Sequence, residues 1–411
     1  MRTSAIIPVA GLSSRMGAFK PLMPLNGFAM IRMTVQAALD GGVAISCVVT
    51  GRESERISEV LREVRANAAC SQVKVVHNRD FATTDMLHSI KIGIRALLDV
   101  ENDETSVDAL FVLPGDIPAV SPRTFGLLRD CAKRTAASVI HPSYKGKRGH
   151  PLLLKRECFD PILTFNGEGG LKGAIGDLRA ENLDVTDEGI ALDADNSEAF
   201  EWLSAYARAT KGLALEVTDA LLASFETPQH IREHGRAVGA LAARMARHLN
   251  SRGFGLDSEL CRSAGELHDM NRLQKHHAKV AAEHLRARGY EAVAKVVGDH
   301  HTMTGDSDDP REPRSTSVGY RDARSTGHTG RDAPSTGYTT STGYSESLIV
   351  FLADKLVKET RLVTLDERYA PALERFPETT AVGRRIRLDR EICREVLRRY
   401  TESTGDHIYS K

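Results

Sequence analysis

Residues 5–20 read AIIPVAGLSSRMGAFK, an apolar run followed by a loop with two glycines and two cations. Such a run of β-branched residues is typical of a strand buried in a parallel sheet. Gly11 and Gly17 allow backbone N–H groups to approach an anion, and Arg15 and Lys20 add positive charge. The spacing fits neither the Walker A loop nor the dinucleotide-binding GxGxxG loop. The stretch predicts a strand and a phosphate-binding loop, with a plain strand-to-helix turn as the alternative.

The same strand-then-helix pattern continues through the first half of the chain. Further short apolar runs occur at residues 45–51, 73–78 and 108–116, and helical spacing occurs at residues 30–42 and 54–66. This alternation predicts a layered α/β fold with a mostly parallel sheet and right-handed crossovers.

The second half of the chain differs in pattern and in composition. From about Leu213 onward, apolar residues follow helical spacing, and eleven of the fifteen histidines come after residue 210. We therefore expect two domains, residues 1–210 and 211–411, with a join near Lys211. Within the second domain, residues 303–346 are polar and repeat STG three times, so we expect a disordered low-complexity insertion there.

Composition excludes several classes of protein. Lys+Arg and Asp+Glu both number 55 in 411 residues, so no overall basic field favours nucleic acid or a membrane surface as a partner. The apolar stretches are far shorter than the roughly 20 residues that span a bilayer. The N-terminus enters a strand directly, without a signal segment, and the six cysteines form no CxxC pair. The expected location is therefore the cytoplasm.

Three aspartates extend the phosphate-loop hypothesis. Asp116 ends an apolar run, where the carboxyl end of a strand in an α/β sheet binds ligands. Asp193 and Asp195 stand two apart, so on a strand they would point to one face. Carboxylates beside a phosphate loop favour a Mg²⁺ site, although aspartates near turns are also common caps.

Four segments, in chain order over residues 4–205, resemble the MobA-like nucleotidyltransferases. VAGLSSRMGAFK is similar to the AGxSxRMGxxK signature of that family, and VLPGDIPAV resembles its metal-binding GDxP segment. LDADNSEAF is similar to its closing element, and residues 144–175 resemble a stretch of the molybdenum cofactor cytidylyltransferase branch. The resemblance implies a GT-A/Rossmann-like domain that transfers a nucleotide from CTP or GTP to a phosphorylated acceptor such as molybdopterin. Pyrophosphate would be released, and a molybdoenzyme or its chaperone is an expected partner.

The resemblance also assigns roles to single residues. Triphosphate binding falls to Gly11, Ser13, Arg15, Gly17 and Lys20. Mg²⁺ binding falls to Asp116 with Asp193 or Asp195. Asn78 and His150 would face the base or the acceptor, and Arg15, Lys20 and Asp116 are the residues expected to serve catalysis.

A second group of residues is found on the helical pattern. His234 lies on the apolar stripe of a helix expected over residues 230–250, where a core histidine is the common alternative. His268 and Asp269 are adjacent in AGELHDMNR, and Asp354 lies inside the apolar run LIVFLADKLV. A carboxylate in such a run should be paired or bound to a metal.

The order of these residues resembles the HD phosphohydrolase superfamily, an all-helical metal-dependent fold, over residues 225–370. By this resemblance, a metal is bound by His234, His268, Asp269 and Asp354, with further ligands among His277, His300 and His301. Asp269 would also serve catalysis, and the implied activity is attack of a metal-activated water on a phosphate ester. Mixed nitrogen and oxygen ligands suit Mn²⁺, Fe²⁺, Ni²⁺ or Zn²⁺. HDMNR lacks the lysine of the commoner HDIGK, so phosphate contacts are expected from Lys355 or Arg361.

Two alternatives remain open at this point. The first half could use a sugar phosphate or another phosphorylated acceptor. The HD half could be a regulatory module that binds a nucleotide without hydrolysing it.

Overall fold

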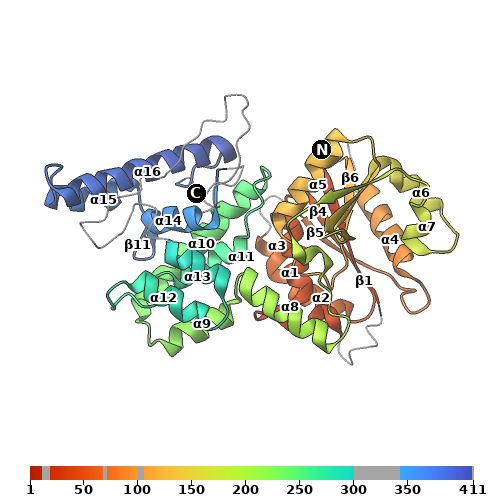
Figure 1. The fold of residues 1–411 in the computed structure, drawn as a ribbon, viewed down its shortest axis with the longest axis horizontal. Coiled ribbons are helices and arrows are strands. Elements are labelled where there is room, and N and C mark those ends of the chain that lie inside the picture. Colours follow the sequence, from red (N-terminus) through yellow and green to blue (C-terminus); the bar gives the residue numbers. More distant parts are fainter. Residues whose placement is uncertain (12–18, 68–71, 100–105, 300–342, 410–411) are drawn as a thin grey trace.

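A computed structural model describes residues 1–11, 19–67, 72–99, 106–299 and 343–409 of the chain. Figure 1 shows an α/β part built on a sheet and, beside it, a helical part. The expected order, an α/β domain followed by a helical domain, is confirmed. The helical part also holds one small hairpin, β11 (Val357–Lys358) with β12 (Arg361–Leu362). Within the described ranges, no helix has the length and apolar character needed to cross a bilayer.

The sheet of the α/β part is mostly parallel. Its strand order is β10-β7-β9-β6-β1-β4-β5, and β9 runs antiparallel to both of its neighbours. The strands β1, β4 and β6 are buried along their whole length, as the continuous apolar runs predict. The sheet strands are β1 (Thr3–Val9), β4 (Ile45–Thr50), β5 (Gln72–His77), β6 (Ala109–Val112), β7 (Val139–Tyr144), β8 (Lys147–Arg148), β9 (Leu152–Lys155) and β10 (Ala180–Asp184).

Helices cover both faces of this sheet. One apolar layer packs α1 and α5 against side chains of β1 such as Ile7, and the other packs α4 and α6 against its neighbour Ile6. The single helix expected over residues 54–66 is interrupted at Leu61, which separates α2 from α3. The helices are α1 (Met30–Asp40), α2 (Ser54–Val60), α3 (Arg62–Asn67), α4 (Met86–Leu98), α5 (Pro122–Arg134), α6 (Phe159–Thr164), α7 (Gly170–Ala174) and α8 (Ser197–Thr210). A small hairpin of β2 (Pro24–Leu25) and β3 (Phe28–Ala29) precedes α1.

The helical part has one apolar core, to which α10, α11, α13 and α14 contribute most. Its helices are α9 (Leu215–Ser224), α10 (Gln229–Asn250), α11 (Ser258–Leu267), α12 (His277–Arg286), α13 (Glu291–Asp299), α14 (Glu346–Leu356), α15 (Leu365–Arg375) and α16 (Ala381–Thr404). The proposed boundary near Lys211 falls in the short join between α8 and α9.

The expected low-complexity insertion lies almost wholly outside the described residues. At the carboxyl end of the expected insertion, however, residues 343–346 are described and ordered. Tyr344 is buried and its ring packs edge-on against Phe254 at 5.0 Å, and the Ser345 side chain accepts from Leu348 N at the start of α14. Residues 343–346 therefore belong to the folded helical part.

Helices α10 and α11 approach each other closely because glycines line their contact. A Cβ atom built on Gly265 of α11 would lie 2.7 Å from the Cα of Gly239 on α10. A Cβ on Gly235 would lie 2.5 Å from the carbonyl oxygen of Glu266. Real side chains do not tolerate such distances, so glycine at these positions sets the separation of the two helices.

The two parts of the chain meet where α1 ends and α11 begins. The Asp40 carboxylate accepts hydrogen bonds from the backbone N of Ser258 at 3.1 Å and from its Oγ at 2.8 Å. Gln36 Nε2 donates to Asp40 at 3.1 Å and to Ser258 Oγ at 3.2 Å. The backbone N–H groups of a first helical turn have no acceptor inside the helix. The Asp40 carboxylate, from the other domain, is the acceptor for the N–H of Ser258 in the first turn of α11.

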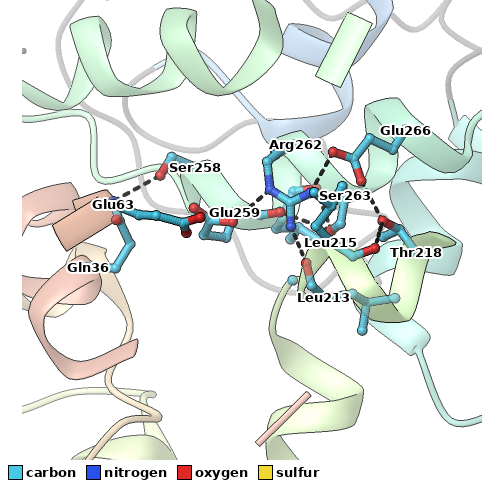
Figure 2. Close-up of polar contacts among 12 residues, drawn as sticks. Gln36, Glu63, Leu213, Leu215, Thr218, Ser258, Glu259, Arg262, Ser263 and Glu266 are labelled. Atoms are coloured by element: carbon cyan, nitrogen blue, oxygen red, sulfur yellow. Dashed lines mark hydrogen bonds and ion pairs between the residues drawn. The ribbon is translucent and has the colours of Figure 1, made fainter. Parts of the chain in front are cut away.

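A charged network continues this contact along α11 (Figure 2). The Arg262 guanidinium donates to Glu259 at 2.8 Å and to Glu266 at 2.6 Å, and it also donates to the backbone carbonyl of Leu213. Thr218 Oγ1 donates to the second Glu266 oxygen at 2.6 Å. From the α/β part, Arg32 lies 3.5 Å from Glu259. Breaking such a buried network leaves a charge without compensation, so the network fixes how the domains dock.

Asp40 should make the stability of the protein depend on pH. Burial raises its pKa to about 7, with the neighbouring Asp257 carboxylate adding to the rise. Because the folded-state pKa is the higher one, the stabilising contribution is complete below pH about 4 and is lost as the pH rises to about 7. Replacing Asp40 by Asn removes this titration. Relative to Asp40→Asn, the wild-type unfolding free energy should fall by up to about 1.4 kcal/mol per pH unit in that range. Urea unfolding followed by circular dichroism measures it, and a constant difference would contradict the assignment.

Candidate functional site

Lys20 lies at the edge of the sheet, in the short 3-10 helix η1 (Lys20–Leu22). It is only 7% exposed, and its Nζ donates to Asp195 Oδ1 at 2.7 Å. The same Nζ lies 4.0 Å from Asp116 Oδ2. Burial disfavours an ammonium that lacks an opposite charge, so these carboxylates keep Lys20 in place. The structure thus brings together three residues that the sequence assigned to one site.

Asp116 reaches this position because Gly115 precedes it. Gly115 N lies 3.3 Å from the carbonyl oxygen of Pro8, and a Cβ at residue 115 would lie 2.1 Å from Val9 Cγ1. Only glycine lets the chain leaving β6 cross the end of β1 at this distance. Asp116 therefore lies at the carboxyl edge of the parallel strands, where sheets of this type bind ligands.

Asp193 and Asp195 do not lie on a strand, contrary to the sequence-based expectation. They occupy the loop between the 3-10 helix η3 (Glu188–Ala191) and α8, with buried Ala194 between them. Burial raises the pKa of Asp116, and the charges of Asp193 and Asp195 add to this rise, whereas Lys20 opposes it. Three carboxylates around one lysine leave excess negative charge, and a hard divalent cation would balance it.

His150 lies near Asp193 of this group. Its Nδ1 is 3.3 Å from the carbonyl oxygen of Val112, and its backbone N donates to the carbonyl of Ile190 at 2.8 Å. Burial lowers the pKa of His150, while the Val112 carbonyl and the charge of Asp193 partly oppose the shift. Because the Val112 carbonyl accepts the hydrogen bond from Nδ1, a neutral His150 imidazole has its Nε2 lone pair left to accept one hydrogen bond.

Asn78 is not available for the role predicted from the sequence. It is 1% exposed, and its amide Nδ2 donates to Thr84 Oγ1 at 3.0 Å and to Ser89 Oγ at 3.2 Å. Its Oδ1 accepts from the backbone N of Asp80 at 3.0 Å. Asn78 therefore holds the loop after β5 together.

Part of the predicted phosphate loop lies outside the described residues. Gly11 is described, exposed and two residues beyond the end of β1. Ser13, Arg15 and Gly17 are not described, so their assignment to a triphosphate stays a prediction.

The second group of predicted residues converges from three helices. His234 comes from α10, His268 and Asp269 follow the end of α11, and Asp354 comes from α14. The close approach of α10 and α11 brings the rings of His234 and His268 to 5.4 Å between centroids. Ligand atoms of His234, His268 and Asp269 all lie within 4.8 Å of one another.

The orientation of both histidines suits metal binding. His234 Nδ1 lies 2.8 Å from the carbonyl oxygen of Glu359, and His268 Nδ1 lies 2.7 Å from that of Gly265. A carbonyl partner requires the proton on Nδ1, which leaves the Nε2 lone pair for a ligand. Both Nε2 atoms face Asp354 Oδ1, at 3.3 and 3.6 Å. Ligands about 2.0–2.2 Å from one ion would have such separations, so the donor set fits a divalent transition metal.

Electrostatics support the same conclusion. Burial acts to lower the pKa of His268, but the Asp269 carboxylate beside it more than offsets this and raises that pKa to about 10. Burial acts in the opposite sense on Asp354, yet Lys355, His234 and His268 hold its pKa well below the usual range. A divalent cation would take the place of the imidazolium proton, as metal binding to histidine releases protons.

Further predicted ligands have different outcomes. His277 begins α12, and its Nε2 lies 3.1 Å from Asp269 Oδ1, so the structure places it beside the cluster. His300 and His301 lie outside the described residues.

Two cationic side chains were missed by the sequence analysis. Arg272 donates to Asp269, and Arg368 of α15 has its Nη2 3.8 Å from Asp354 Oδ1. Arg272 occupies the position of the lysine in HDIGK, a signal that could have been read. Lys355 pairs with Asp354 Oδ2 at 2.7 Å, and its expected phosphate contact stays a prediction. Arg361, by contrast, is 63% exposed and lies 3.8 Å from Glu367, so its expected phosphate contact has no support here.

Comparison with known proteins relates each half of the chain to a family. Residues 5–183 match the model of the MobA-like NTP transferase domain, and residues 231–358 match that of the HD domain. The molybdenum cofactor cytidylyltransferase of Escherichia coli is 26% identical over 195 residues, which are 47% of this chain and 92% of that protein. An uncharacterized protein of Methanocaldococcus jannaschii is 32% identical over 80 residues, 19% of this chain and 47% of that protein. A solved nucleotidyl transferase from Methanothermobacter thermautotroptrophicus is 25% identical, with 49% of this chain and 96% of that chain covered and a TM-score of 0.41.

These family matches support an enzyme of the nucleotidyltransferase class that carries a second, helical domain. The first domain is a MobA-like NTP transferase domain, and the second is an HD domain.

The metal centre can be tested with one matched pair of variants. His234→Gln removes a ligand nitrogen, and His230→Gln changes an exposed histidine one turn earlier on α10. We expect His234→Gln to lose its transition metal and His230→Gln to keep the wild-type metal stoichiometry. Of these two histidines, His234 directs its Nε2 at the cluster, whereas His230 is exposed. Elemental analysis of the purified proteins measures this. Equal metal content in the two variants would exclude His234 as a ligand.

Proposed function

We propose that the α/β domain transfers CMP from CTP to the terminal phosphate of molybdopterin or of the molybdenum cofactor. The observation that carries this proposal is similarity to the E. coli molybdenum cofactor cytidylyltransferase over 92% of that protein's length. Lys20 and the carboxylates Asp116, Asp193 and Asp195 support it, because this group suits a magnesium-bound triphosphate. A cytoplasmic location and delivery to a molybdoenzyme or its chaperone belong to the same proposal.

In this reaction, a phosphate oxygen of the acceptor attacks the α-phosphorus of CTP, and pyrophosphate leaves with the bond electrons. The acceptor is already a nucleophile, so alignment and charge neutralisation matter more than a strong base. Asp116 with Asp193 or Asp195 would hold Mg²⁺, which supplies positive charge to the phosphates. Lys20 would face the developing charge on pyrophosphate together with the loop at Gly11–Lys20, and His150 would face the acceptor.

We further propose that the HD domain is a metal-dependent phosphohydrolase. His234, His268, Asp269 and Asp354 would hold a divalent ion, which lowers the pKa of a water molecule and polarises a phosphate ester. The complete donor set, with both Nε2 atoms directed inward, favours hydrolysis over a purely regulatory role.

A variant pair tests the transferase assignment. We expect Lys20→Gln to lower pyrophosphate release by about 10²–10³, as for loss of one preorganised donor to a developing oxyanion. Lys133→Gln, an exposed lysine on α5 that pairs with Asp130, should leave the rate unchanged. Activity near wild type in Lys20→Gln would exclude the phosphate role.

The nucleotide and acceptor are tested directly by a screen. Pyrophosphate release is measured with CTP or GTP and with molybdenum cofactor or a sugar phosphate as acceptor. The proposal requires CTP with the cofactor to give the fastest release. If a sugar phosphate gives the fastest release, the proposed acceptor is wrong, but the assignment as a nucleotidyltransferase stands.

A further inference from the structure

Helix α15, which packs on α16, reaches the candidate metal centre from outside the residues that match the HD domain. That match ends at residue 358, and α15 begins at Leu365. In the first turn of α15, the Arg368 guanidinium lies 3.8 Å from Asp354 Oδ1, and its Nη1 lies 3.4 Å from the carbonyl oxygen of Val357. Its side chain is about one quarter exposed, so a ligand in solution can reach it.

Several contacts fix α15 in this place. Thr364 and Glu367 form a capping box at its start, and buried Tyr369 approaches Cys393 of α16 at 3.5 Å. On the outer side, Asp366 accepts from Arg390 and Arg394 of α16. A capped helix packed on a partner holds its side chains with little rotational freedom. Arg368 is therefore positioned by the helix pair.

Neutralising Asp354 does not require Arg368. Lys355 already pairs with Asp354 Oδ2 at 2.7 Å, whereas Arg368 stays at 3.8 Å from the other oxygen, which also faces His234 and His268. A guanidinium at this distance is not a close ion-pair partner. Its free donors can serve another oxygen acceptor near the same carboxylate.

The charge balance around the centre points to an anion. Three cations, Lys355, Arg272 and Arg368, face two carboxylates, Asp269 and Asp354. With His268 neutral, as it would be when a metal replaces its proton, these five groups leave one positive charge in excess. A bound divalent metal would raise that excess to three. Partly buried charge of one sign requires a counterion, and a phosphate dianion carries charge and oxygens that suit a guanidinium fork.

We propose that Arg368 binds the phosphate group of the ligand at the HD centre, and that α15 and α16 form part of this site. The inference rests on the proposed metal-dependent function of the HD domain. It assigns one wall of the site to a helix pair that the HD match does not include.

Inorganic phosphate is the probe, and full-length protein loaded with Mn²⁺ is titrated by calorimetry. Arg368→Gln should raise the dissociation constant for phosphate by about tenfold to a hundredfold, the effect of losing one charge-assisted hydrogen bond. Arg368→Lys should recover part of the affinity. Arg375→Gln, at the other end of α15, should bind phosphate like the wild type. All four proteins should hold the same amount of metal and unfold at similar temperatures.

Each other outcome is decisive. Unchanged phosphate affinity in Arg368→Gln, with wild-type binding intact, would overturn the inference and leave the proposed phosphohydrolase in place. Loss of metal in Arg368→Gln and Arg368→Lys would mean that Arg368 only supports the ligand Asp354. Absence of phosphate binding by metal-loaded wild-type protein would overturn this inference, and absence of metal uptake would overturn the phosphohydrolase proposal as well.

Discussion

The close approach of α10 and α11 is the constraint on which the candidate metal centre depends. Gly239 and Gly265 leave no room for a Cβ between the two helices, and Gly235 lies next to the backbone of Glu266. Because His234 and His268 are neighbours of these glycines in the chain, their rings meet at 5.4 Å. A methyl group added at the contact would separate the helices and with them the two imidazoles, since packed interiors have no spare volume.

Helix α11 also joins the two halves of the enzyme. Its first residue, Ser258, is held by Asp40 of the α/β domain, and its last turn leads into His268 and Asp269. The helix is ten residues long, about 15 Å, so one rigid element runs from the domain interface to the metal centre. Arg262 fixes the middle of the helix to the interdomain join (Figure 2). The HD centre is therefore built on a helix whose position is set partly by the transferase domain.

The sequence was most informative where local pattern and chemistry coincide. The apolar runs predicted the buried strands, and the resemblance to the HD superfamily predicted His234, His268 and Asp269 as neighbours. Other features depend on contacts that no local pattern records. Asp40 bonds to Ser258, which is 218 positions away in the sequence. The amide of Asn78 donates its hydrogen bonds to Thr84 and Ser89. Arg368 approaches the cluster from a helix that carries no recognised motif. Asp193 and Asp195 lie near Asp116 as predicted, but in a loop and not on the expected strand. Acidic side chains can meet at one site from a loop as well as from a strand.

Two separate cation sites in one chain are the central claim, and anomalous diffraction from crystals grown with Mn²⁺ and CTP tests it most directly. The account predicts one peak beside Asp116 and Asp195 next to the nucleotide phosphates. It predicts a second peak bounded by His234 Nε2, His268 Nε2, Asp269 and Asp354. Absence of the second peak, or a peak that these four side chains do not touch, would contradict the account.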